Sequence, residues 1–318
     1  MHYRRLGNTG LKVSEISLGA WLTFGGQIED LTANQLVKAA FDGGINFFDC
    51  ADAYRNGEAE KVLGEAVKDI PRNELVISSK VFFPTMEGPN GRGLSRKHIS
   101  ESIARTLKNL QMDYIDIYYC HRYDPDTPVE EVVRTMNDLI ARGQIFYWGT
   151  SEWTASQVAE AHGTAEKLGL IGPAVEQPQY NLLHRKRVEE LLMPVASRFG
   201  MGITSFSPLA GGVLTGKYND GIPEGSRASR EEMSWMKSMI TPDRMEPIRA
   251  FTQYAKELEL HPAQLSLAWL LRRKEVSSVI TGATKLSQLE SNLKAAEFVG
   301  KLDNEILEHI DVLFEGFE

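Results

Sequence analysis

The chain has 318 residues, of which 42% are hydrophobic and 25% charged, a composition that supports a large buried core and argues against disorder. Its 35 basic and 43 acidic side chains give a formal charge of −8 without any long basic run, so binding to nucleic acid is not expected. The two cysteines, Cys50 and Cys120, exclude a disulfide-dense scaffold, and the lack of a signal-like or bilayer-length apolar stretch predicts a cytoplasmic protein without membrane insertion.

The chain opens with a predicted hairpin and then alternates short apolar runs with longer amphipathic segments. Residues 3–6 and 11–14 flank Asn8-Thr9-Gly10, a sequence that suits a tight turn. Eight strand-like runs follow, over residues 16–19, 47–50, 75–79, 114–120, 145–149, 174–177, 202–205 and 278–281.

The segments between these strands have helical spacing and recognisable helix starts. Ser95 is a predicted N-cap, Thr154 is predicted to start a helix, Pro128 is predicted in the first turn of a helix, and Pro262 begins another. Strands joined by helices of this length pair in parallel through right-handed crossovers. Eight such units favour a closed (β/α)8 TIM barrel over an open doubly wound sheet. We therefore expect one domain over residues 1–318, with the N-terminal hairpin closing the barrel bottom.

Four ionisable residues follow predicted strands, at the end of the barrel where reactive groups of this fold lie. They are Asp49, Tyr54, Lys80 and His121. A buried lysine needs a counter-charge, which Asp49 can supply from the adjacent strand. Lys80 and His121 should stabilise the phenolate of Tyr54 and lower its pKa below about 10. Tyr54 could then act as a general acid toward a carbonyl oxygen, with His121 orienting the carbonyl.

Each of these residues also has a structural explanation when it is taken alone. Tyr54 could be a packing residue, Lys80 a solvated strand end, Asp49 a turn cap and His121 a structural histidine. Their occurrence together at successive strand ends favours chemistry. The set contains no nucleophile–base pair, and its spacing is poor for a tetrahedral site, so no metal is expected. The longest irregular stretch, from residue 209 to about 243, is expected to be a lid or binding loop.

The motifs around these residues resemble those of the aldo-keto reductases along essentially the whole chain. Residues 43–60 are similar to the family's first signature, and residues 112–121 and 149–151 to later ones. The resemblance implies reduction of small aldehydes or ketones to alcohols, and a catalytic tetrad of Asp49, Tyr54, Lys80 and His121.

Within the family, the chain resembles the branch that contains the β subunits of voltage-gated potassium channels, through residues 19–27, 92–98, 147–151 and 226–229. Relatives in that branch form four-fold rings, so the resemblance suggests a homotetramer and a channel partner. Animal channel subunits tend to carry Asn where this chain has His121, which favours a working reductase. A channel subunit that senses redox state through bound nucleotide is the alternative, and a barrel kept for binding only is disfavoured by the intact tetrad.

The resemblance also implies NADP(H), bound without a Rossmann fold, and the sequence contains no strand–Gly-x-Gly-x-x-Gly–helix element. Ser151 and Gln177 match residues that hold the nicotinamide amide, and Phe206 matches an aromatic that stacks on the ring. Many relatives have Arg where this chain has Gln288, so NADH is the alternative cofactor. The implied cofactor-binding residues are Trp21, Gln27, Asp49, Ser151, Gln177, Phe206, Ser207, Pro208, Leu209, Ala210, Lys217, Arg227, Gly282, Thr284, Gln288 and Asn292.

An aromatic barrel mouth is expected to bind the substrate. Its lining would suit small aromatic or aliphatic carbonyls and would offer no fixed cation for a carboxylate. Cys50 and Cys120 should point away from it as buried packing thiols, with a redox role as the alternative, because adjacent strand residues face opposite sides. The candidate substrate-binding residues, each of which could instead belong to the core, are Trp21, Tyr54, Phe82, Phe83, His121 and Trp148.

Overall fold

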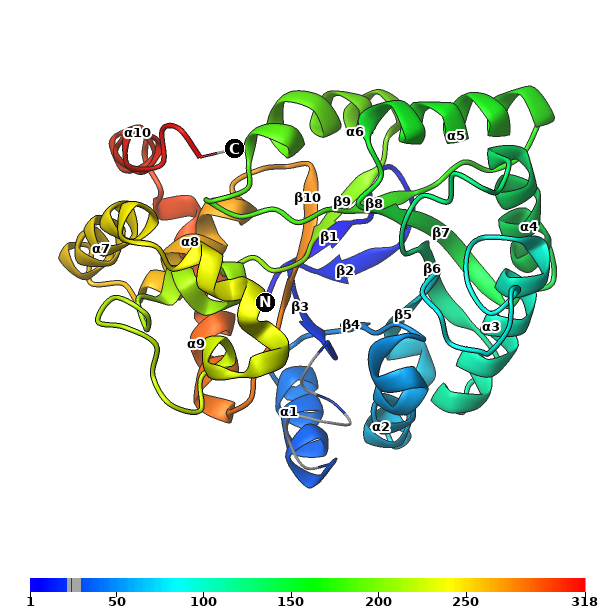
Figure 1. Ribbon diagram of the computed structural model, residues 1–318, viewed down its shortest axis with the longest axis horizontal. Helices are drawn as coiled ribbons and strands as arrows, with labels where there is room; N and C mark the ends of the chain where they lie inside the picture. The colour runs from blue at the N-terminus through cyan, green and yellow to red at the C-terminus, as the bar shows by residue number, and fades with distance from the viewer. Residues whose placement is uncertain (22–23, 25–29, 318) are drawn as a thin grey trace.

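A closed barrel of eight parallel strands forms the centre of the molecule in the computed structural model, which describes residues 1–21, 24 and 30–317 (Figure 1). The predicted TIM barrel is therefore confirmed, and its apolar runs are buried strands. The order around the barrel is β10, β3, β4, β5, β6, β7, β8 and β9. The strands are β3 (Ile16–Gly19), β4 (Phe47–Asp49), β5 (Val76–Val81), β6 (Ile115–Cys120), β7 (Ile145–Ser151), β8 (Val175–Gln177), β9 (Gly202–Ser205) and β10 (Val276–Thr281).

Helices surround the barrel and bury their apolar faces against it. The side chain of Ser95 accepts a hydrogen bond from the backbone N–H of His98 at the start of α3, and Thr154 forms a capping box with Gln157 at the start of α5. Pro128 is the N-cap of α4 and so precedes the first helical turn, in which it was predicted to lie. The helices are α1 (Asp30–Asp42), α2 (Glu58–Val67), α3 (Arg96–Leu110), α4 (Val129–Ala141), α5 (Ala155–Leu168), α6 (Met193–Phe199), α7 (Pro242–Glu257), α8 (Pro262–Leu271), α9 (Leu286–Leu293) and α10 (Asn304–Leu313). In the part of the chain that the structure describes, none of them combines the length and the apolar character that a bilayer span requires.

The N-terminal hairpin, β1 (Tyr3–Arg5) and β2 (Lys12–Ser14), closes the bottom of the barrel as predicted. Its Leu6 and Val13 are fully buried against inward-facing strand residues such as Ile117. The left-handed residue of its turn is Gly7, outside the expected Asn8-Thr9-Gly10 sequence. A Cβ at Gly7 would lie 2.3 Å from the carbonyl oxygen of Gly200, so the hairpin docks through a contact that only glycine permits.

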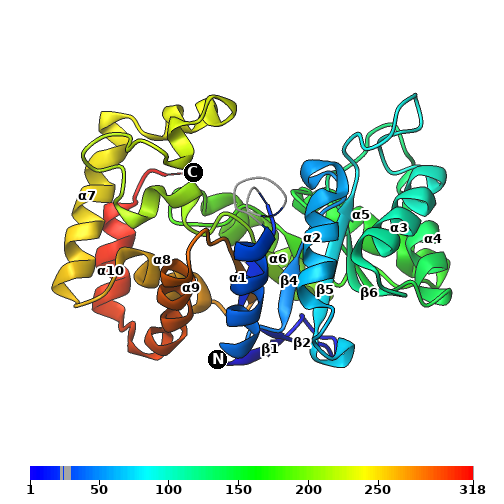
Figure 2. The ribbon, with the colours of Figure 1, turned by 90° about the horizontal axis from the view of Figure 1, so that it is seen from below.

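The long segment after β9 lies at the opposite end of the molecule from the hairpin. Figure 2 shows β1 and β2 at the bottom and the yellow-green turns that precede α7 at the top. Short 3-10 turns over Ala210–Thr215, Arg227–Ser229 and Glu231–Met239 interrupt this expected irregular stretch. Residues between 209 and 227 border a cavity of about 1170 Å³, so this segment forms one wall of it.

Candidate active site

The four candidate catalytic residues meet at the carboxyl ends of three neighbouring strands. Asp49 ends β4, Lys80 lies on β5 and His121 follows β6, while Tyr54 occupies the turn after β4. Strands β4, β5 and β6 pair in register, so their ends converge on one side of the barrel mouth. The ring centroids of Tyr54 and His121 are 5.9 Å apart in an edge-on arrangement.

Lys80 is the centre of this group and is completely buried. Its ammonium Nζ donates to Asp49 Oδ2 at 2.6 Å and to the Cys50 carbonyl at 2.7 Å, and it lies 3.3 Å from the Tyr54 hydroxyl. The predicted counter-charge of Lys80 is therefore confirmed. An ammonium held at three acceptors has a fixed position, so it places positive charge beside the Tyr54 oxygen.

Two neutral donors hold the other carboxylate oxygen of Asp49 in place. The Ser78 hydroxyl donates to Asp49 Oδ1 at 2.7 Å, and the Gln177 amide donates to the same atom at 3.1 Å. The Ser151 hydroxyl in turn donates to the backbone carbonyl of Gln177 at 2.8 Å. These bonds join the Asp49–Lys80 pair to the two residues that are expected to hold a nicotinamide amide. Ser78 was not among the predicted site residues, although it lies two residues before Lys80 and therefore faces the same side of β5.

The turn that carries Tyr54 has an unusual backbone. Arg55 and Asn56 both have left-handed φ angles, 51° and 53°, and Gly57 follows at 89°. Left-handed non-glycine residues are uncommon and persist only where their surroundings fix them. Buried Glu60 supplies such an anchor, because its carboxylate accepts hydrogen bonds from three side chains on β5 and α3, those of Ser79, Thr106 and Asn109.

Burial dominates the acid–base properties of the site. It raises the pKa of Tyr54 to about 12, although the nearby charge of Lys80 acts in the opposite direction. The prediction of a lowered Tyr54 pKa is therefore wrong for this structure, because burial, together with the nearby charge of Asp49, raises the pKa more than Lys80 lowers it. Burial also lowers the pKa of Lys80, but Asp49 and Tyr54 more than offset it, so that the pKa lies above its usual value. Burial, with Lys80 and Arg122 nearby, keeps the pKa of His121 well below its usual value.

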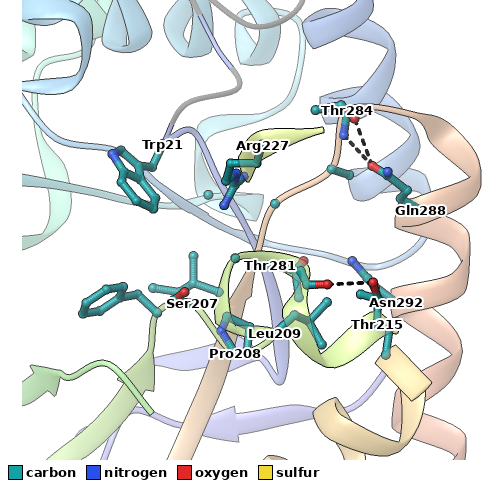
Figure 3. Close-up of a pocket in the computed structure, with 18 of the residues that line it drawn as sticks. Trp21, Ser207, Pro208, Leu209, Thr215, Arg227, Thr281, Thr284, Gln288 and Asn292 are labelled. Carbon is teal, nitrogen blue, oxygen red and sulfur yellow. Dashed lines mark hydrogen bonds between the residues drawn. The ribbon is translucent and has the colours of Figure 1, made fainter. Parts of the chain in front are cut away.

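A cavity of about 1170 Å³ opens above this group and runs along the barrel mouth. That is larger than the roughly 300–1,000 Å³ of most small-molecule pockets, and it leaves room for a dinucleotide and a small substrate together. Asp49, Tyr54 and His121 line one end. The other end lies between the loop after β9 and helix α9, where Thr284 donates to Gln288 (Figure 3). Most of the expected cofactor-binding residues line it, namely Trp21, Asp49, Ser151, Gln177, Phe206, Ser207, Pro208, Leu209, Lys217, Arg227, Gly282, Thr284, Gln288 and Asn292.

Three of the expected site residues do not reach this cavity. Trp148 is fully buried on the outer side of β7, where its indole N–H donates to the Ile171 carbonyl at 2.9 Å. Ala210 packs into the core, and Phe82 packs against the core and against Phe83 at 5.4 Å between ring centroids. The other expected substrate-binding residues, Trp21, Tyr54, Phe83 and His121, line the cavity, and Gln27 lies outside the described residues.

The cavity carries positive charge away from the tetrad, which fits a phosphate-bearing ligand. Arg227 is half-buried with its guanidinium 5.7 Å from the Trp21 ring centroid, and burial lowers its pKa (Figure 3). No carboxylate within the described ranges forms an ion pair with it or with Lys217. A Cβ at left-handed Gly212 would lie 2.5 Å from Lys217 Nζ, so the glycine makes room for that ammonium. Two cations without acidic partners in one cavity are suited to a diphosphate.

The cavity is also lined by charged residues that were not among the predicted binding residues. Arg122 lies at the tetrad end, which corrects the expectation of a mouth without a cation. Glu152 lies after β7 with a left-handed φ of 60° and pairs with Arg187 at 3.2 Å. The expected packing role of the two cysteines is confirmed by their position, since both thiols are fully buried in the core outside the cavity.

Comparison with known proteins places the whole chain in one family. The model described as "Aldo/keto reductase family" matches residues 15–315. A "Probable voltage-gated potassium channel subunit beta" from Oryza sativa subsp. japonica is 46% identical over 320 residues, which cover 99% of this chain and 97% of the relative. A protein of the same name from Arabidopsis thaliana has the same identity and coverage. A "Putative voltage-gated potassium channel subunit beta" from Schizosaccharomyces pombe is 47% identical over 316 residues, covering 97% and 92%.

Proposed function

Since this chain belongs to the aldo/keto reductase family, we propose that it is a single-domain, NADPH-dependent oxidoreductase that reduces small aldehydes or ketones to alcohols. Oxidoreductase activity and the use of NAD(P)H are general to the family. The observation that carries the finer proposal is the position of the Lys80 ammonium, which contacts both Asp49 and the Tyr54 hydroxyl beside His121. The proton donor Tyr54 and the neutral imidazole of His121 then line the same end of the cavity, and the buried positive charge of Lys80 lies directly beside the Tyr54 hydroxyl.

The residues that would hold the cofactor lie along the cavity from the tetrad to α9. Ser151 and Gln177 would take the nicotinamide amide, Phe206 would stack on the ring, and Lys217 and Arg227 would neutralise the phosphates. When bound, NADPH supplies a hydride to the carbonyl carbon. Gln288 is neutral, so preference for NADPH over NADH would rest on cations such as Arg227 and Lys285, which also lines the cavity.

The tetrad would supply the proton and stabilise the charge that develops on the substrate oxygen. With a pKa of about 12, Tyr54 keeps its hydroxyl proton at neutral pH and can donate it to the carbonyl oxygen. Lys80 then stabilises the phenolate that is left, and Asp49 keeps Lys80 in place. His121, held neutral by its low pKa, can donate an N–H to the same oxygen and orient the carbonyl.

The direct test is consumption of NADPH and NADH by the purified protein with a panel of small aldehydes, such as nitrobenzaldehydes and methylglyoxal. Steady oxidation of NADPH, faster than that of NADH, supports the proposal. Tight NADPH binding without turnover of any carbonyl would contradict the proposal and would favour a second candidate function.

The second candidate is a cytoplasmic subunit of a potassium channel that senses redox state through bound NADP(H). The names of the three relatives, which describe them as potassium channel β subunits, favour it. It would require a homotetramer, which light scattering can measure, and a channel partner. Co-purification with the cytoplasmic domain of a potassium channel from the same cell would support it, and a monomer that does not bind such a domain would contradict it. The two candidates are compatible, because one nucleotide site can serve both.

A further inference from the structure

We propose that Arg122 binds a carboxylate on the substrate, so that this protein prefers aldehydes or ketones that carry an anionic group. The inference rests on the proposed reductase function and names the substrate class of the same site. Arg122 directly follows His121 and lines the cavity at its tetrad end. A fixed guanidinium at this place would distinguish charged carbonyl compounds from neutral ones of equal size.

The guanidinium is held in place from one side. Its Nη1 donates to the backbone carbonyl of His121 at 2.5 Å, and its central carbon lies 5.5 Å from the centroid of the Phe83 ring. Phe83 in turn packs edge-on against the His121 ring at 4.9 Å between centroids. Arg122 also helps to lower the pKa of His121, which shows that its charge acts on the tetrad. The cation is therefore positioned next to the group that would orient the carbonyl.

The rest of the guanidinium is available to a ligand. No oxygen in the described part of the chain accepts a hydrogen bond from Arg122 Nε or Nη2, and Arg122 takes part in no ion pair there. A half-buried guanidinium without an acid costs solvation energy that a bound carboxylate would recover. Its planar fork can bind both carboxylate oxygens at once, which an ammonium cannot do.

The other charges of the cavity do not serve this purpose. Lys217, Arg227 and Lys285 lie on the loops after β9 and β10, where the cofactor phosphates are expected. Of the acidic residues at the tetrad end, Asp49 pairs with Lys80 and Glu152 pairs with Arg187. Arg122 is therefore the cation at the tetrad end that the described carboxylates leave uncompensated, and it gives that end a preference for an anion.

The test compares two aldehydes of similar size, one of which is anionic and the other neutral. The carboxylate substrate is 4-carboxybenzaldehyde, and its neutral counterpart is methyl 4-formylbenzoate. We expect Arg122→Met to lower the ratio of kcat/KM for the acid to that for the ester by about 10–100-fold, mainly through KM, because a charge-assisted bidentate contact is lost. Arg122→Lys should restore part of the preference, since it keeps the charge and loses the fork.

Arg92→Met is the matched control. Arg92 also lies over an aromatic ring, that of Phe82 at 5.9 Å, but it does not line the cavity. The ratio should be unchanged in that variant. An Arg122→Met enzyme that keeps the wild-type ratio would overturn the proposal while leaving the reductase function intact.

A binding measurement separates this proposal from the proposed function. Calorimetry of the NADP+-bound protein with terephthalate, which has two carboxylates and no reducible carbonyl, needs no turnover. Binding that weakens about 10-fold or more in Arg122→Met supports the carboxylate site even if neither aldehyde is reduced. Equal binding by both forms, or no binding by either, contradicts it.

Discussion

Asp49 and Lys80 form a fully buried ion pair, with Asp49 Oδ2 2.6 Å from Lys80 Nζ, on two adjacent parallel strands. The pair has two effects. The Asp49 carboxylate neutralises the Lys80 ammonium, which β5 carries into the protein interior, and the pair holds that ammonium 3.3 Å from the Tyr54 hydroxyl. Stability and the proposed chemistry therefore depend on the same contact.

Asp49→Asn should destabilise the fold by about 3–5 kcal/mol, because it leaves Lys80 charged and buried without a partner. Urea denaturation measures this free energy of unfolding. The matched control is Glu58→Gln, which breaks another lysine–carboxylate pair at 2.6 Å, that of Lys61, with both side chains more than half exposed. That change should cost less than about 1 kcal/mol. Equal losses of unfolding free energy in the two variants would show that the buried pair contributes no more to stability than the exposed one.

The pH dependence of carbonyl reduction should be flat across the neutral range. An ordinary tyrosine loses its proton near pH 10 and an ordinary histidine gains one near 6.5. Here the pKa of Tyr54 is raised to about 12, so the proton donor stays loaded as the pH rises through 10. The pKa of His121 is lowered, so its imidazole stays neutral as the pH falls through 6.5. A profile of kcat with a limb near pH 7 would contradict these assignments.

Arg227→Met should weaken NADPH binding by about 10–100-fold, because the change removes a half-buried cation from the wall of the cavity. Binding can be followed by the fluorescence of the bound dinucleotide. Arg230→Met is the control, since Arg230 lies three residues further along and does not line the cavity. Equal NADPH affinity in the two variants would exclude a role for Arg227 in phosphate binding.

The sequence predicted the barrel and the meeting of the tetrad because both depend on strand period and strand ends. The two-residue period of side chains along a strand could also have excluded Trp148 from the predicted substrate-binding residues. Ser151 faces the cavity, so Trp148, three residues earlier on β7, faces the opposite side, where it is buried. Arg122 could not be placed in this way, because it lies two residues beyond the end of β6 and its direction is set by the loop and by Phe83.

The raised pKa of Tyr54 was not predictable either. Its neighbours could be named from the sequence, and Lys80 does act to lower the pKa. The net direction depends on how far the hydroxyl is enclosed and on how closely Asp49 neutralises Lys80, which are properties of the packed structure. The left-handed backbone of Arg55 was equally hidden, since arginine rarely adopts it, whereas Asn56-Gly57 is a dipeptide that favours such a turn.

The most direct test of the account is turnover of NADPH with a small aldehyde by Tyr54→Phe, measured beside Tyr123→Phe. Tyr123 is a half-buried tyrosine that does not line the cavity, so its variant should keep wild-type activity. Loss of the Tyr54 hydroxyl should lower kcat by at least about 100-fold while NADPH affinity stays within about 2-fold, because the proton donor is removed and the cofactor cavity is unchanged. Turnover that survives in Tyr54→Phe at the level of Tyr123→Phe would contradict the assignment of Tyr54 as the general acid.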